Sequence, residues 1–180
     1  MKRLLFIIIL SFFLFGCKSP EPRKPLVSKS GSFIKESVER NKKLNKDESE
    51  HIERLISSMP EKEYIISENG FWYTYNIKVD DDSSTAQFGD KLVYVYSISD
   101  LKNNTIYSQN ELGLQSYYMD KEELFQGLRE GLKLMKVGED VTFIFPSQKA
   151  FGYYGDDNKI GTNVPLIVNV NLKTITQNND

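Results

Sequence analysis

The residue types that carry acid–base, metal or nucleophilic chemistry are sparse in this sequence. Its 180 residues include a single histidine, His51, and a single cysteine, Cys17. His51 stands beside Glu50 and Glu53 without a second ligand or nucleophile nearby, which is typical of a solvated surface histidine. The acidic run at residues 80–82 lacks the glycine and the distal glutamate of a calcium-binding loop, so we interpret it as a solvated turn. We therefore expect no metal ion and no cofactor.

Apolar and aromatic residues around one long loop offer a different chemistry. The loop spans residues 147–163 and contains the sequence Ala150-Phe151-Gly152-Tyr153-Tyr154-Gly155. A loop of this length in a compact domain is usually functional or disordered, and its aromatic residues argue against disorder. An aromatic face closed by this loop would form an apolar ligand cleft. Such a cleft suits a reaction without a proton shuttle, such as rotation about an Xaa-Pro amide bond. The barrier of about 18–20 kcal/mol falls when the carbonyl leaves water and the twisted amide is favoured.

A short helix and two strands must position this loop. Apolar residues recur at helical spacing over residues 124–135. Gly127 and Gly131 lie on an adjacent row of this predicted helix, where they permit close approach to a sheet. Residues 140–146 and 164–172 flank the loop, and both are predicted to be strands, the second with apolar and polar residues on opposite faces.

Further strands are predicted earlier in the chain. Residues 63–67 and 71–77 are rich in aromatic and β-branched residues and are separated by Glu68-Asn69-Gly70, which predicts a hairpin. Residues 92–98 alternate with the period of a strand, and residues 105–108 follow a turn. Together these elements predict an α+β domain, with an antiparallel sheet of about five strands and one central helix packed on it.

An additional helix is predicted over residues 45–60. Asn45-Lys46-Asp47-Glu48 has the pattern of a capping box, and apolar residues follow at helical spacing until Pro60. Residues 17–44 are predicted to be a lipid anchor and flexible tether, because three of the six prolines lie between residues 18 and 31. Within this range, charges dominate residues 32–43 and apolar residues are sparse, which indicates either frayed helix or disorder.

Residues 1–16 have the pattern of an export signal. A basic start, Met1-Lys2-Arg3, is followed by an apolar run of about a dozen residues, which is too short to span a bilayer. The sequence Leu14-Phe15-Gly16-Cys17 resembles a bacterial lipoprotein box, in which the cysteine is lipidated and becomes the new N-terminus. The alternative is a plain secretory peptide with an incidental cysteine. We expect a protein of the cell envelope that is lipid-anchored to a membrane and faces the periplasm.

The charge balance argues against a nucleic-acid partner. The net charge is -2 and the isoelectric point is near 5.6, and basic runs interleaved with aromatic residues are missing from the sequence.

Ordered signatures in the second half of the chain resemble those of FKBP-type peptidyl-prolyl isomerases. They are Gly127-x-x-x-Gly131-Leu132-x-x-Met135-x-x-Gly138-Glu139, Phe145-Pro146, Ala150-Phe151-Gly152 and Pro165-Leu166-Ile167-Val168-x-Val170-x-Leu172. The resemblance reaches back more weakly to Gly89 and covers about half of the chain. With the signal sequence and the N-terminal helix, the whole is most similar to the gliding-motility-associated FKBP-type lipoproteins of bacteria. It implies an FKBP-like antiparallel five-stranded sheet wrapped over one central helix, in a domain at residues 61–180.

The resemblance also implies a proline pocket with altered walls. Its lining residues would be Tyr96, Ile106, Tyr107, Leu124, Phe125, Leu128, Phe151, Ile160 and Val168. Tyr96 stands where the family has a strand tyrosine, and Ile160 is retained in kind. The backbone N–H of Phe125 is the expected hydrogen-bond donor to the ligand.

Several of these residues differ from the family pattern. Ile106 and Tyr107 replace a Phe-Asp pair, so the aromatic wall shrinks and the carboxylate is absent. Leu128 replaces the tryptophan at the pocket floor, Phe151 a tyrosine, and Val168 a phenylalanine. Because an indole buries more surface than leucine, we expect weaker affinity for proline. For each position the alternative is ordinary core or loop packing.

Two functions follow from the resemblance. The first is a lipid-anchored isomerase that acts on proline-containing polypeptides and assists the folding of exported or envelope proteins, including those of a gliding-motility or secretion apparatus. The alternative is a non-catalytic FKBP-fold chaperone or binding module within an envelope assembly, which the altered pocket favours.

Overall fold

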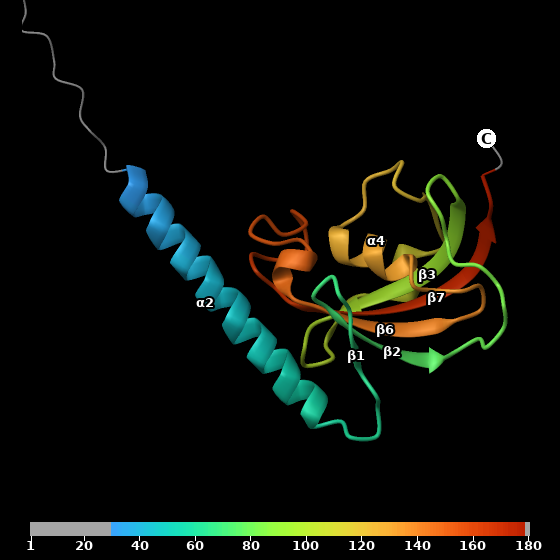
Figure 1. Cartoon of the computed structure of the whole chain (residues 1–180), viewed down its shortest axis with the longest axis horizontal. Coiled ribbons are helices and arrows are strands. Elements are labelled where there is room, and N and C mark those ends of the chain that lie inside the picture. Colours follow the sequence, from blue (N-terminus) through green and yellow to red (C-terminus); the bar gives the residue numbers. More distant parts are fainter. Residues whose placement is uncertain (1–29, 179–180) are drawn as a thin grey trace, which may run out of the picture. The chain divides into compact units, whose positions relative to one another are not determined.

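The computed structural model describes residues 30–178 (Figure 1). The chain divides into two compact units, residues 1–36 and 37–180. The described part of the first unit is the start of helix α2, Ser30–Ser57. The second unit holds the rest of α2, one sheet and the short helices α3, Gln109–Leu112, α4, Gln126–Leu132, and η2, Ser147–Lys149. Cys17 and the predicted signal sequence lie outside the described residues.

The sheet is antiparallel throughout, which confirms the predicted α+β class. Its strands are β1, Ile65–Ile66, β2, Trp72–Ile77, β3, Lys91–Ser99, β4, Thr105–Tyr107, β5, Gln115–Tyr118, β6, Asp140–Phe145, and β7, Leu166–Thr176. They follow the order β1-β2-β6-β7-β3-β4, with β5 also paired to β3.

The described residues thus form seven strands, where the sequence predicts about five. The predicted hairpin corresponds to β1 and β2, which pair with Ile65 opposite Tyr73. The strand that sequence analysis missed is β5, whose sequence Gln-Ser-Tyr-Tyr is too short to show a period of two. It forms because it pairs with the start of β3 and places Tyr117 in the core.

Helix α4 packs closely against β6, as the two glycines predict. A Cβ on Gly127 would lie 2.5 Å from the Cδ1 atom of Phe145, and one on Gly131 would lie 2.9 Å from the Cε1 atom of Phe143. Any larger residue at either position would therefore push the helix off the strand. The helix is shorter than the predicted span of 124–135, and a turn with a hydrogen bond from the N–H of Leu134 to the carbonyl of Gly131 follows it.

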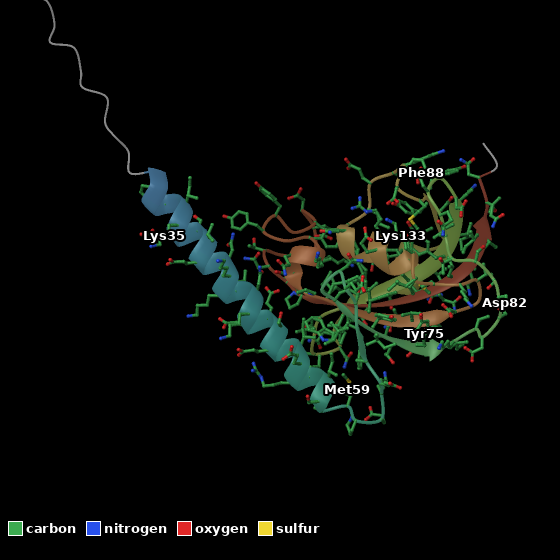
Figure 2. The ribbon with its side chains drawn as sticks, viewed as in Figure 1. Lys35, Met59, Tyr75, Asp82, Phe88 and Lys133 are labelled. Carbon is green, nitrogen blue, oxygen red and sulfur yellow. The ribbon has the colours of Figure 1, made fainter. Side chains whose placement is uncertain are left out.

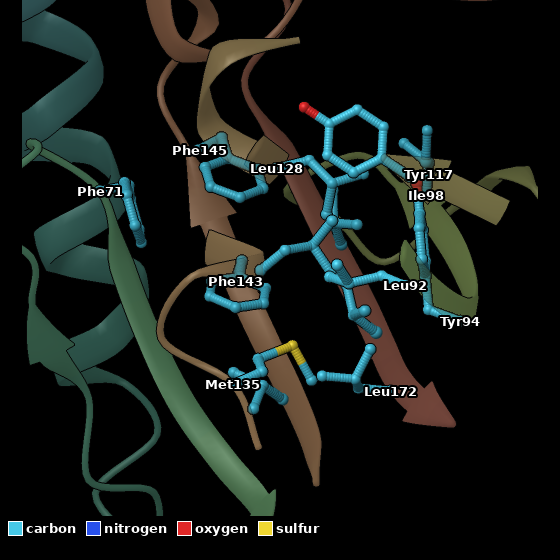
Figure 3. Packing of buried hydrophobic residues seen from close by; sticks show 14 of the residues in the cluster. Phe71, Leu92, Tyr94, Ile98, Tyr117, Leu128, Met135, Phe143, Phe145 and Leu172 are labelled. Atoms are coloured by element: carbon cyan, nitrogen blue, oxygen red, sulfur yellow. The ribbon is translucent and has the colours of Figure 1, made fainter. Parts of the chain in front are cut away.

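The main core lies between α4 and one face of the sheet (Figure 3). Phe143 and Phe145 of β6 stack with ring centroids 5.5 Å apart, and Leu128 of α4 is completely buried in the same cluster. On β7 the apolar residues predicted to share a face, Leu166, Val168, Val170 and Leu172, are all buried. The alternation in β7 therefore decides which side chains α4 covers.

Helix α2 begins at Ser30, so the predicted helix start at Asn45 and the predicted flexible tether are wrong for residues 30–44; of the two alternatives for residues 32–43, helix is the one observed. Asn45 lies within the helix, and its side-chain amide donates a hydrogen bond to Oε1 of Gln148 at 2.8 Å. The earlier residues are helical because no glycine or proline occurs between residues 32 and 59. Most side chains along this helix are polar and exposed; in Figure 2, Lys35 labels its first half and Met59 lies just beyond its C-terminal end.

The second half of α2 docks on the sheet face opposite α4. Ile52 is fully buried and packs with Trp72, Ile144 and Ile167, which alternate in sequence with residues of the main core. The carboxylate of Glu48 accepts hydrogen bonds from the backbone N–H of Ser147 at 2.8 Å and from its hydroxyl at 2.7 Å. These contacts bind the helix to the start of the 147–163 loop. Among the helices within residues 30–178, none has the length and apolar character needed to cross a bilayer.

Candidate active site

The sequence-predicted site residues come together on the side of the sheet that α4 covers. All nine belong to the main core cluster or pack against it. Tyr96 is on β3, Ile106 and Tyr107 are on β4, and Val168 is on β7; Leu124 and Phe125 precede α4, Leu128 is within it, and Phe151 and Ile160 are in the 147–163 loop. The nine residues thus come from five separate segments of the chain, which tertiary contacts bring together.

Their burial divides them into two groups. Leu128 and Val168 have no exposed surface, and Ile160 is only 3% exposed. The other six residues, Tyr96, Ile106, Tyr107, Leu124, Phe125 and Phe151, are half-buried. These six supply the surface that a ligand would contact, whereas Leu128 and Val168 support it from beneath in this conformation.

Phe125 occupies the centre of the aromatic contacts. Its ring lies 5.6 Å from that of Phe145 and 5.0 Å from that of Phe151, measured between centroids. Its extended backbone, with φ −61° and ψ 142°, forms the N-cap of α4. Within the described residues no acceptor is found for the N–H of Phe125, which leaves this donor for a ligand carbonyl.

The structure brings in a carboxylate that sequence analysis missed. The hydroxyl of Tyr107 donates a hydrogen bond to Oδ2 of Asp156 at 2.5 Å. The backbone N–H groups of Ile160 and Asn158 donate to Oδ1 of Asp156 at 2.7 and 3.0 Å. The expected lack of a carboxylate holds for position 107 itself, but Asp156 supplies one through the loop. The Asp-Asp-Asn sequence that begins at Asp156 is typical of side-chain-capped turns and was the available signal.

The hydrogen bond between Tyr107 and Asp156 affects the pKa values of both groups. Desolvation alone would raise the pKa of Asp156, but the bonds from Tyr107, Ile160 and Asn158 outweigh it and hold the pKa below its ordinary value of 3.8. The acceptor bond to Asp156 raises the pKa of Tyr107 above 10.0, because removing the proton would place two negative groups together. At neutral pH the phenol therefore stays protonated and the carboxylate stays charged.

Lys159 fastens the loop to β4 and α3. Its ammonium group lies 4.7 Å from the centroid of the Tyr107 ring, donates to the carbonyl of Ile106 at 3.3 Å and pairs with the carboxylate of Glu111. Gly155 allows the loop to close, because it has φ +73° and a Cβ there would lie 2.2 Å from the carbonyl oxygen of Ile160. The loop thus has a defined conformation beside β4.

Tyr96 contributes a neutral aromatic wall. Burial, and to a lesser degree the proximity of Tyr107, raises its pKa above 10.0, and its ring lies 5.6 Å from that of Tyr94. Across residues 30–178 no three His, Cys, Asp or Glu side chains are close enough to hold a metal ion. The site therefore offers apolar surface, one backbone donor and phenol groups, which suit binding and desolvation of an amide.

Comparisons with known proteins agree with this geometry. Residues 82–173 match the family model described as FKBP-type peptidyl-prolyl cis-trans isomerase, which is slightly more than half of the chain. No match was found among curated proteins.

Two solved structures share the fold. FkpA from Escherichia coli aligns with a TM-score of 0.60 and 20% sequence identity, over 98% of this chain and 82% of its own. A peptidyl-prolyl cis-trans isomerase from Pseudomonas syringae pv. tomato str. DC3000 aligns with a TM-score of 0.60 and 16% identity, over 76% of this chain and 96% of its own. At these sequence identities the two structures show the fold alone. Because the family model matches more than half of the chain, this chain belongs to the FKBP-type peptidyl-prolyl cis-trans isomerases.

Proposed function

We propose that this protein catalyses cis/trans isomerisation of Xaa-Pro bonds in exported or envelope proteins and so assists their folding. The observation that carries the proposal is the half-buried aromatic surface of Tyr96, Phe125 and Phe151 beside the unpartnered N–H of Phe125 within an FKBP-type domain. Proline-containing polypeptides are the substrates that this family membership implies.

The site residues act on the amide by binding it out of water. A proline ring packs against Phe125 and Phe151, and the N–H of Phe125 donates to a substrate carbonyl. Moving the amide into this apolar surface disfavours the charge-separated resonance form that makes the C–N bond stiff, and so lowers the rotational barrier. Because no proton is transferred, the rate should be insensitive to pH between the pKa values of Asp156 and Tyr107.

The test is the rate of cis-to-trans relaxation in a peptide with Leu or Phe before the proline. We expect acceleration by the wild-type protein at micromolar concentration and a clear loss in the Phe125→Ala variant. Phe88→Ala is the matched control, because Phe88 is an aromatic residue outside the site that is 67% exposed. No acceleration by the wild type, together with unchanged refolding of a proline-limited protein, would contradict catalysis.

Non-catalytic binding is the second candidate function. Complete burial of Leu128 and Val168 favours it, because these residues leave less apolar surface for a proline ring than larger floor residues would. A membrane partner that co-purifies and is retained by Phe125→Ala would support a binding module outside the pocket. Loss of the partner on this substitution would assign the binding to the isomerase site.

A lipid on Cys17 is proposed to hold the protein at a membrane of the cell envelope, facing the periplasm. The basic start, the apolar run and the small residue before the cysteine support it. Clients in a motility or secretion apparatus are proposed from the resemblance to gliding-motility-associated lipoproteins, which rests on the signal sequence and the N-terminal helix. Cys17→Ser should leave the protein unprocessed or soluble after cell fractionation, and a variant that stays lipidated and membrane-bound would contradict the proposed anchor.

A further inference from the structure

A second hollow lies beside the proposed isomerase site, between α2 and the 147–163 loop. It has a volume of about 610 Å³. One wall is the segment of α2 from Arg40 to Asn45, and the other is formed by residues 147–148 and 152–154 together with Asn163. We refer to it as the α2–loop groove. None of the nine predicted site residues lines it.

The groove carries an exposed pair of aromatic side chains. Tyr153 is 70% exposed and Tyr154 is 85% exposed, and their rings meet edge to face at 5.5 Å. Tyrosines in the core, such as Tyr94, show that this chain can bury the residue type where packing requires it. Exposed tyrosines next to a hollow have the composition of binding hot spots, where a rigid ring supplies contact area at low entropic cost.

The rest of the lining is mostly polar, with Leu44 as its one aliphatic side chain, and contains no acidic residue. Asn41, Asn45 and Gln148 carry amide groups, which can both donate to and accept from a peptide backbone. Arg40 adds the single charge of the lining. This combination suits an extended polypeptide segment that is neutral or acidic, because main-chain groups find partners along the groove and a carboxylate finds a cation.

The two walls are held in place before any ligand binds. The buried carboxylate of Glu48 accepts both hydrogen bonds from Ser147, and Asn45 on one wall donates a hydrogen bond to Gln148 on the other. A preformed groove loses less conformational entropy on binding than a mobile one, which increases its affinity for a flexible segment.

Adjacent residues of the same loop line the groove and the proposed isomerase site. Phe151 packs against Phe125 in that site, and the next residue, Gly152, already lines the groove. Because Tyr153 follows Phe151 by only two residues, the segment that flanks a proline bound on Phe125 is within reach of Tyr153 and Tyr154. We propose that the α2–loop groove binds this flanking segment of an unfolded client, in extended conformation; the assignment of the neighbouring site to proline rests on the function proposed above.

The experiment compares a ligand that reaches the groove with one that does not. The probes are a fluorescently labelled, carboxymethylated unfolded protein, whose binding is followed by anisotropy, and a proline tetrapeptide, whose isomerisation is followed as kcat/KM. In the Tyr153→Ser/Tyr154→Ser double variant we expect the affinity for the unfolded protein to fall on the order of tenfold. The kcat/KM for the tetrapeptide should stay unchanged.

Phe88→Ser is the matched control, since it removes another exposed aromatic residue from outside the groove, and both readouts should equal those of the wild type. Wild-type affinity in the double variant would overturn the proposal, as would an equal loss in both readouts. The wild type could fail to isomerise the tetrapeptide while the double variant still loses affinity for the unfolded protein. That result would contradict the proposed isomerase function and support binding of the client in the groove.

A charge reversal provides a second readout. Arg40→Glu should weaken binding of an acidic unfolded segment and strengthen binding of its basic counterpart, because it inverts the only charge in the lining. Equal effects on the two segments would contradict recognition by the groove.

Discussion

Asp156 is a residue outside the family signatures that links two segments of the candidate active site. Its carboxylate accepts hydrogen bonds from Tyr107, Ile160 and Asn158 and so links β4 to the loop that carries Phe151. At position 107 this chain has a tyrosine where the family pattern has an aspartate. In the folded protein the carboxylate of Asp156 lies at the hydroxyl of that tyrosine. The local effect is a loop held in one conformation at neutral pH.

This linkage predicts a pH-dependent contribution to stability. The folded pKa of Asp156 is lowered, so its contribution is fully present above the unfolded value of about 3.9 and is lost as the pH falls through the folded pKa. Asp156→Asn should therefore lower the free energy of unfolding at pH 7, and the difference from wild type should shrink below pH 3.8. Urea unfolding of the wild type and the variant, at pH 7 and at a pH below 3.8, measures this difference in the free energy of unfolding.

Asp82→Asn is the control, because Asp82 lies in an exposed turn. It should leave the free energy of unfolding unchanged at pH 7. A deficit of Asp156→Asn that persists unchanged into strong acid would show that shape, rather than charge, holds the loop.

Helix α2 shows the limits of local signals at the scale of an element. The sequence has the capping-box pattern at Asn45, but the helix starts at Ser30. It continues through Asn45 because no glycine or proline occurs between residues 32 and 59. Lys46, Glu50 and Arg54 follow at intervals of four, with ion-pair distances of 3.8 Å, a pattern that supports helix on a solvated face. Asn45 instead serves a tertiary contact with Gln148.

The Glu48–Ser147 contact predicts a specific loss of stability. Glu48→Gln offers one carbonyl oxygen where the carboxylate offers two, so one of the two buried donors of Ser147 loses its acceptor. We expect a cost of about 1–3 kcal/mol in the free energy of unfolding, from urea titration, and faster amide exchange in the second half of α2.

Glu50→Gln on the same helix is the matched control. The side chain of Glu50 is 49% exposed and only its surface ion pairs are lost, which should cost about 0–1 kcal/mol. Equal losses in the two variants would show that Glu48 contributes charge alone.

At the scale of the whole molecule, the sheet has a core on each face. The face with Phe143, Phe145 and Val168 packs on α4 and supports the candidate active site. The opposite face, with Trp72, Ile144 and Ile167, receives Ile52 of α2. Because β6 and β7 contribute to both cores, the same two strands support the candidate active site and the helix that forms one wall of the α2–loop groove.

The second core predicts a spectroscopic response to a single substitution. Ile52→Ala should cost about 2–5 kcal/mol through lost burial and a residual cavity. Trp72 is the only tryptophan and packs in the same cluster as Ile52, so its fluorescence should shift to the red as water gains access.

Val38→Ala, at an apolar position of α2 that is 46% exposed, should change neither stability nor fluorescence. An unchanged Trp72 spectrum in the Ile52→Ala variant would contradict the docking of α2 on this face.

The sequence alone was sufficient for the family, the α+β class and most of the strands. These follow from local causes: alternation in residues 164–172 reports one buried face, and Gly127 and Gly131 report close contact between helix and sheet. The nine predicted site residues do converge, because their spacing is tied to that fold. Their roles in binding proline remain predictions.

Other features were decided only by tertiary structure. The strand β5, the placement of Asp156 on Tyr107 and the contact of Glu48 with Ser147 join residues that are far apart in sequence or lack a periodic signal. A local pattern specifies which face of a helix or strand is apolar. Only the packing of several elements decides which polar groups form hydrogen bonds with one another and which apolar side chains stay accessible to a client.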